Sequence, residues 1–123
     1  MNQDRSELSG GDAQPQGQER LPGFLDRVIA DYPDVWQAYR MLGDAAAAAG
    51  PLDARSQRLV KLALAVGARS PGAVHSHARR ALREGVPAAA LLQVPLLAVS
   101  SIGWSAAMAA LAWVRDVTDA PAS

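Results

Sequence analysis

Both histidines of the chain fall within the eight residues Ser70-Pro71-Gly72-Ala73-Val74-His75-Ser76-His77, directly after an Ala/Leu-rich helical segment. An imidazole can act as a general acid or base near neutral pH, so His77 is the candidate catalytic residue. His75 lies two positions earlier, about 200° away around a helix with 3.6 residues per turn. Such a pair cannot hold one metal ion from a regular helix, unlike a pair four residues apart. A metal site would need further ligands from another helix or subunit, and the carboxylates of the chain form no matching motif, so we expect no metal site.

Two interpretations of His77 remain open. Val74, Ala78 and Ala81 form an apolar stripe at helical spacing, and His77 lies at its edge. The residue is then either a proton-transfer group or a histidine at the edge of the core that hydrogen-bonds a backbone carbonyl. His75 is expected to be solvated or to lie in an interface.

The chain contains no cysteine. This composition excludes a disulfide framework, a thiolate metal site and a cysteine nucleophile within the sequence. Ser70 precedes Pro71 at the start of a helical pattern, where a hydroxyl caps the helix. No serine lies in a nucleophile elbow, so serine catalysis is not expected.

The 123 residues suffice for one domain with a core of moderate size. Hydrophobic residues make up 50% and charged residues 20%, which is typical of a soluble globular protein. Twelve basic and twelve acidic side chains balance, so neither nucleic acid nor an anionic membrane is indicated as a partner. No apolar stretch is long enough to span a bilayer and no secretory signal follows Met1, so we expect a cytoplasmic protein.

The sequence predicts that all the elements that position His77 are helices. Residues 1–20 are mostly polar and are expected to be a flexible tail, residues 21–119 a helical domain, and residues 120–123 a second short tail. Phe24 to Tyr32 predicts a first helix, and a second begins at Pro33 and runs to Gly50. Asp53 should cap a third.

The second half of the chain continues the helical pattern. The fourth helix should start at Ser70 and end at Glu84-Gly85. The fifth should start at Pro87 and be kinked or split by Pro95, whose ring removes a backbone hydrogen bond. After a break over residues 100–103, a last helix carries Trp104. The prediction is an all-α bundle of about six helices.

This layout resembles the active-site segment of the alkyl hydroperoxidase D / carboxymuconolactone decarboxylase family, in which Cys-x-x-Cys-x-x-x-His opens a helix after a helix that carries a glutamate. The resemblance covers roughly residues 33–117. Overlaying the family's histidine on His77 places its cysteines at Ser70 and Ala73 and its glutamate at Arg58. Three further segments resemble the family's sequence pattern and occur in the same order: Gly50-Pro51-Leu52-Asp53, Ala78-x-x-Ala81-Leu82-x-x-Gly85 and Ile102-Gly103-Trp104. The resemblance implies the family's helical fold and a homo-oligomer, a trimer or a hexamer.

The departures from the family pattern limit what chemistry it implies. Without thiols the chain cannot be a thiol peroxidase. The decarboxylase branch carries a glutamate four residues before its histidine, where this chain has Ala73. What remains is His77-centred proton transfer on a small organic acid, without a cofactor, in a pocket between the third, fourth and last helices.

Arg58 or Lys61 would then hold the ligand's carboxylate, and His75, Ser70 and Trp104 are further candidate substrate-binding residues. A cation at Arg58 would disfavour a protonated His77. Arg58 as a solvated cation is the other interpretation. For the whole chain, the alternative is a non-catalytic ligand-binding or assembly subunit that kept the fold.

Overall fold

The computed structural model describes residues 23–121, and within this range the chain forms six α-helices and no strand. The predicted tail over residues 1–20 lies outside the described residues, as do the last two residues of the C-terminal one. The predicted all-α fold is confirmed. The helices are α1 (Phe24–Asp31), α2 (Pro33–Ala47), α3 (Ala54–Gly67), α4 (Pro71–Arg83), α5 (Ala88–Ile102) and α6 (Trp104–Thr118).

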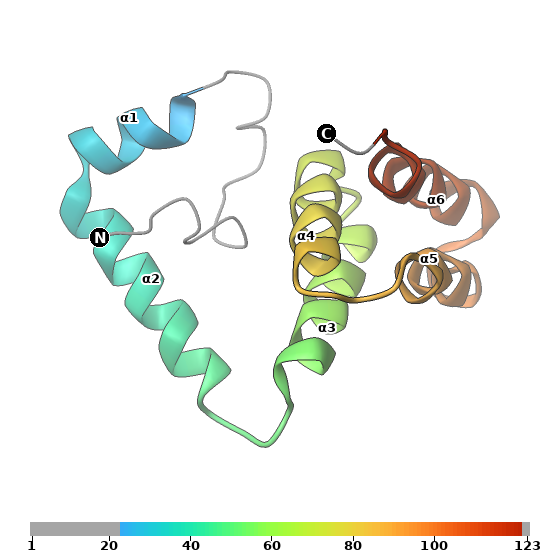
Figure 1. Ribbon diagram of the computed structural model, residues 1–123, viewed down its shortest axis with the longest axis horizontal. Helices are drawn as coiled ribbons and strands as arrows, with labels where there is room; N and C mark the ends of the chain where they lie inside the picture. Colours follow the sequence, from blue (N-terminus) through green and yellow to red (C-terminus); the bar gives the residue numbers. More distant parts are fainter. Residues whose placement is uncertain (1–22, 122–123) are drawn as a thin grey trace.

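The molecule divides into a four-helix bundle and an arm (Figure 1). In the bundle α3 packs on α4 and α5, and α6 packs on the same two helices from the other side. The arm consists of α1 and α2, and the main packing partner of each is the other. Neither arm helix contains a buried residue. The chain therefore presents α2 as one wall of a V-shaped molecule instead of a fifth helix of the core.

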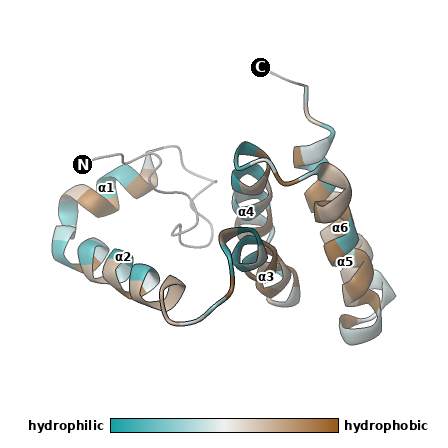
Figure 2. Cartoon of the chain, turned by 60° about the horizontal axis from the view of Figure 1, so that its bottom comes forward, coloured by the Kyte–Doolittle hydropathy of each residue, from teal (hydrophilic) through white to brown (hydrophobic). Residues whose placement is uncertain are grey.

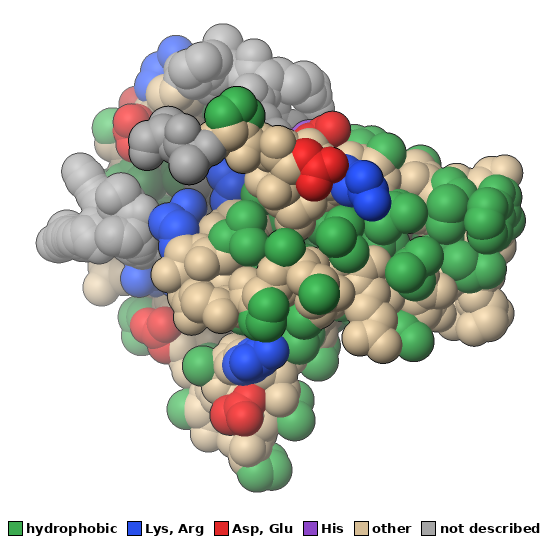
Figure 3. All heavy atoms as spheres, turned by 45° about the vertical axis from the view of Figure 1, so that its right-hand side comes forward, with side chains coloured by type: hydrophobic (Ala, Val, Ile, Leu, Met, Phe, Trp, Pro, Cys, Tyr) green, Lys and Arg blue, Asp and Glu red, His purple; other side chains and the backbone are tan. Residues whose placement is uncertain are grey.

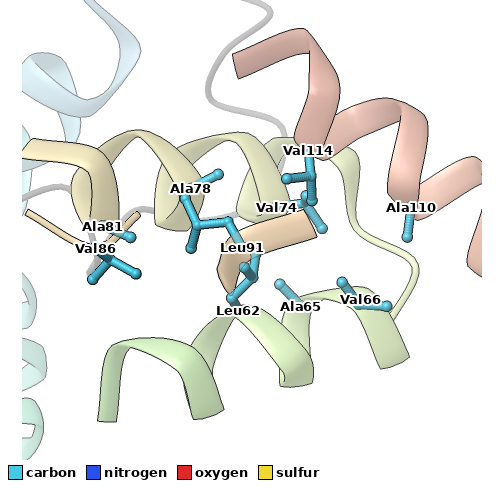
Figure 4. Close-up of a cluster of buried hydrophobic side chains, with 10 residues drawn as sticks. All are labelled: Leu62, Ala65, Val66, Val74, Ala78, Ala81, Val86, Leu91, Ala110 and Val114. Atoms are coloured by element: carbon cyan, nitrogen blue, oxygen red, sulfur yellow. The ribbon is translucent and has the colours of Figure 1, made fainter. Parts of the chain in front are cut away.

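The core of the bundle consists of small and branched aliphatic side chains that point inward from all four helices (Figure 4). Leu62 from α3 and Leu91 from α5 are fully buried at its centre. The predicted stripe of α4 is confirmed, because Val74, Ala78 and Ala81 are all buried. In Figure 2 the most polar parts of the bundle are one end of α4 and the start of α3, and α5 and α6 are mostly apolar. Within the described range, no helix has the length and apolar character needed to cross a membrane.

The helix starts follow the local sequence. The Asp53 side chain accepts a hydrogen bond of 2.7 Å from the backbone N–H of Ser56, which holds the start of α3 and lowers the pKa of that carboxyl. Ser70 accepts one of 3.3 Å from the backbone N–H of Ala73 at the start of α4. Both predicted caps are confirmed.

The helix pattern departs from the expectation at three places. The second helix ends at Ala47 and does not reach Gly50. Pro95 does not split α5, which runs from Ala88 to Ile102 as one helix with Pro95 buried. Contacts of α5 with α3 and α6 outweigh the one hydrogen bond that the proline removes. The predicted break over residues 100–103 is reduced to Gly103, whose φ of 91° favours glycine.

Candidate functional site

Arg58 is a buried cation, with 7% of its surface exposed. Its Nε donates to Oε1 of Glu84 over 3.2 Å and its Nη2 to Oε2 over 3.3 Å, so the carboxylate is held by two parallel bonds. The interpretation of Arg58 as a solvated cation is therefore wrong. A buried charge without a partner is strongly destabilising, and Glu84 supplies the compensating charge.

Glu84 is placed by the end of α4. Gly85 adopts φ 91°, and the N–H of Val86 bonds back to the carbonyl of Ala81 over 2.9 Å, which stops the helix at this residue. A carboxylate at a helix C-terminus faces the negative end of the helix dipole. Arg80, one turn earlier, compensates by donating from Nε to Oε2 of Glu84 over 3.2 Å. One carboxylate thus bridges two arginines.

The contact between Arg58 and His77 fixes a proton position. Arg58 Nη1 lies 3.1 Å from His77 Nδ1. A guanidinium only donates hydrogen bonds, so Nδ1 must be the acceptor and the ring proton of neutral His77 sits on Nε2. His77 is partly buried, and the cation that contacts it lies at the position of the family's glutamate in the overlay.

A cleft of about 340 Å³ lies between the arm and the bundle. Its walls come from α2, from the first turns of α3 and from the end of α4. We predicted a pocket lined by the third, fourth and last helices. α2 takes the place of the last helix, because α6 packs on the opposite side of α4. The cleft is lined by Tyr39, Arg40, Leu42, Gly43, Asp44, Ala46, Ala47, Ala54, Gln57, Arg58, Lys61, Arg80 and Glu84.

The structure brings two of the predicted site residues, Arg58 and Lys61, to the cleft. His77 contacts Arg58 but is not among the residues that line the cleft. Ser70 is buried and caps α4. His75 and Trp104 lie outside the cleft lining.

His75 points to the other side of α4, as the helical spacing predicts. Its Nε2 lies 2.9 Å from Oδ2 of Asp116 on α6, so it links two helices of the bundle. Trp104 begins α6 with 68% of its surface exposed. Among the described residues no three His, Asp or Glu side chains form a cluster that could hold a metal ion.

Sequence reasoning missed Glu84 as a member of the site. Its partner Arg58 is 26 positions away, so no local pattern joins them. The available signal was its position four residues after Arg80 and directly before Gly85, which places a carboxylate at the end of the helix that carries His77.

The sequence pattern of the carboxymuconolactone decarboxylase family matches residues 33–116, which include every residue of this site. The chain belongs to this family. Within it, the chain is a member without cysteine, and it carries Arg58 and Ala73 at two positions where the overlay expects a carboxylate and a thiol.

A relative with a similar sequence is an uncharacterized protein of Haemophilus influenzae, 44% identical over 50 residues. The matching segment covers 41% of this chain and 44% of that protein. The chain therefore spans less than half the length of this relative. No solved structure matches the chain.

Proposed function

We propose that this decarboxylase-family chain binds a small organic acid in the cleft between α2 and α3. The observation that carries the proposal is the charge of the cleft. Its lining has four cations (Arg40, Arg58, Lys61 and Arg80) and two carboxylates (Asp44 and Glu84). An excess of cations in a partly enclosed space favours an anionic ligand. The volume of about 340 Å³ is at the small end of the range for ligand sites.

The cations of the cleft divide into two roles in this proposal. Arg58 is buried and bonded to Glu84, so it serves as a fixed positive wall. Lys61 follows Arg58 by one turn of α3 and lines the same cleft, and its ammonium group is a compact charge on a flexible stem. Arg80, which also donates to Glu84, adds to this wall. Lys61 would pair with the ligand's carboxylate, and the alanines of α2 would contact its apolar part.

The tautomer of His77 favours binding over proton transfer by this residue. A general base needs a free lone pair, and the Nδ1 lone pair accepts from Arg58 while Nε2 carries the proton. Arg58 cannot pass a proton between His77 and Glu84, because arginine keeps its own proton in proteins. We therefore assign His77 a positioning role: it holds the guanidinium of Arg58.

Isothermal titration with succinate and with its neutral diamide tests the proposal. We expect the acid to bind and the diamide not to bind, because only the acid carries the charge that the cleft attracts. Lys61→Gln should weaken succinate binding about tenfold, the value of one charge-assisted contact of about 1.4 kcal/mol.

Arg115→Gln provides the matched control, since Arg115 is an exposed cation on α6 outside the cleft. It should leave the affinity for succinate unchanged. Equal binding of acid and diamide, or equal loss in both variants, would contradict the proposal.

A further inference from the structure

A second hollow, of about 220 Å³, adjoins the cleft at the end of the V where α2 joins α3 (Figure 1). We call it the end hollow. Its walls come from the end of α2, from the connection that follows it and from α3. Ala46, Ala47, Gln57 and Lys61 line both the cleft and the end hollow. The two spaces are therefore neighbours, and Lys61 lies at their junction.

The end hollow is apolar except at this junction. The residues that line it without lining the cleft are Gly50, Leu52, Val60 and Leu64. Of its described lining residues, only Lys61 is charged. The carbonyls of Ala47 and Leu52 already accept hydrogen bonds from the Gln57 amide. The lining thus offers apolar contacts to a carbon chain and one positive charge beside them.

The folding of the single chain does not explain these apolar side chains. Leu52 is 56% exposed, Val60 46% and Leu64 67%. The α3 residues that line the end hollow share one face of the helix, and the buried Leu62 and Val66 lie on the other face. Exposed apolar side chains that gather around a hollow beside a charged group are typical of a binding site.

We propose that the ligand of this site is a monocarboxylic acid with an aliphatic chain, which lies in the end hollow while the carboxylate pairs with Lys61. The inference rests on the proposed function, from which it takes the contact with Lys61, and it adds the chemical class of the acid. Residues three apart on a helix are neighbours, with about 5–6 Å between their Cβ atoms. A short alkyl chain whose carboxylate is held at Lys61 therefore reaches Leu64.

Titration with butanoate, hexanoate and octanoate, each below its micelle concentration, tests the inference. We expect the affinity to rise about fourfold for each two carbons added. In free energy this is about half the effect of complete burial of two CH₂ groups, because the lining residues are about half exposed and enclose the chain only on one side. Octanamide, which has the same chain without the charge, should bind at least tenfold more weakly than octanoate.

Leu64→Ser should remove the dependence on chain length. Exposed hydrophobic side chains also lie elsewhere, and Figure 3 shows them over much of the face it views. Leu97→Ser is therefore the matched control: Leu97 is 66% exposed and lines a separate apolar groove between α3 and α5. The rise per two carbons should fall below about twofold in Leu64→Ser and stay at about fourfold in Leu97→Ser. Both variants should bind succinate as the native chain does and stay helical by circular dichroism.

The outcomes separate this inference from the proposed function. Equal affinity for the three acids, with succinate bound and its diamide not bound, would overturn the inference and leave the proposed function standing. Equal affinity for octanoate and octanamide would contradict both. An unchanged dependence on chain length in Leu64→Ser would place the alkyl chain elsewhere and overturn the inference. If light scattering then showed a changed particle mass for this variant, Leu64 would belong to a contact between copies.

Discussion

The role that we propose for His77 follows from the position of one proton. Arg58 occupies Nδ1 of the ring, so the histidine that the family overlay marks for proton transfer acts here as a hydrogen-bond acceptor for a buried cation. Glu84 supplies the carboxylate that the overlay places on α3, but it comes from the end of α4. A cation on α3 thus meets a carboxylate and an imidazole that both come from α4 and its end.

Substitution of His77 separates the positioning role from a catalytic one. The side-chain oxygen of asparagine occupies the place of Nδ1, so His77→Asn should keep the bond from Arg58, the melting temperature and succinate binding. His77→Leu removes the acceptor from the buried guanidinium and should lower the free energy of unfolding by about 1–3 kcal/mol. Thermal melts and titration of both variants provide the measurement. Loss of binding in His77→Asn with unchanged stability would show that His77 acts on the ligand directly.

At the scale of elements, helix ends were predictable and long-range partners were not. Asp53, Ser70 and Gly85 act on backbone groups within a few residues, so their caps can be read from the sequence. The pairing of Arg58 with Glu84 depends on how α3 packs on α4, which no local pattern encodes. The position of α2 in the wall of the cleft was not predicted, for another reason. Its amphipathic pattern requires a partner surface but does not say whether that surface belongs to the same chain.

The cap of α3 makes a pH-dependent contribution to stability. The hydrogen bond from Ser56 lowers the pKa of Asp53 below its ordinary value in the folded chain. A lowered folded-state pKa adds stability above the unfolded pKa, and this contribution disappears as the pH falls through the folded value. Asn caps a helix as well as Asp but does not titrate.

The melting temperature of the native chain should therefore exceed that of Asp53→Asn at pH 7, and the difference should shrink between about pH 5 and pH 3. Circular dichroism melts of both chains across this range measure the difference. A difference that stays constant with pH would contradict the assignment of the effect to this carboxylate.

At the scale of the whole molecule, the proposed ligand site depends on the position of α2. One side of this helix lines the cleft through Tyr39, Leu42 and Gly43. The main packing partner of α2 is α1, so the wall of the cleft is held chiefly by the connection to α3.

Loosening the connection between α2 and α3 should therefore weaken ligand binding. The amide of Gln57 donates to the carbonyls of Ala47 over 3.0 Å and Leu52 over 2.8 Å and so holds this connection. If the wall is in place only about a tenth of the time in Gln57→Ala, the apparent affinity for succinate falls about tenfold. Titration of this variant beside Arg115→Gln measures the effect. Equal affinity in the two variants would show that α2 holds its position without this connection.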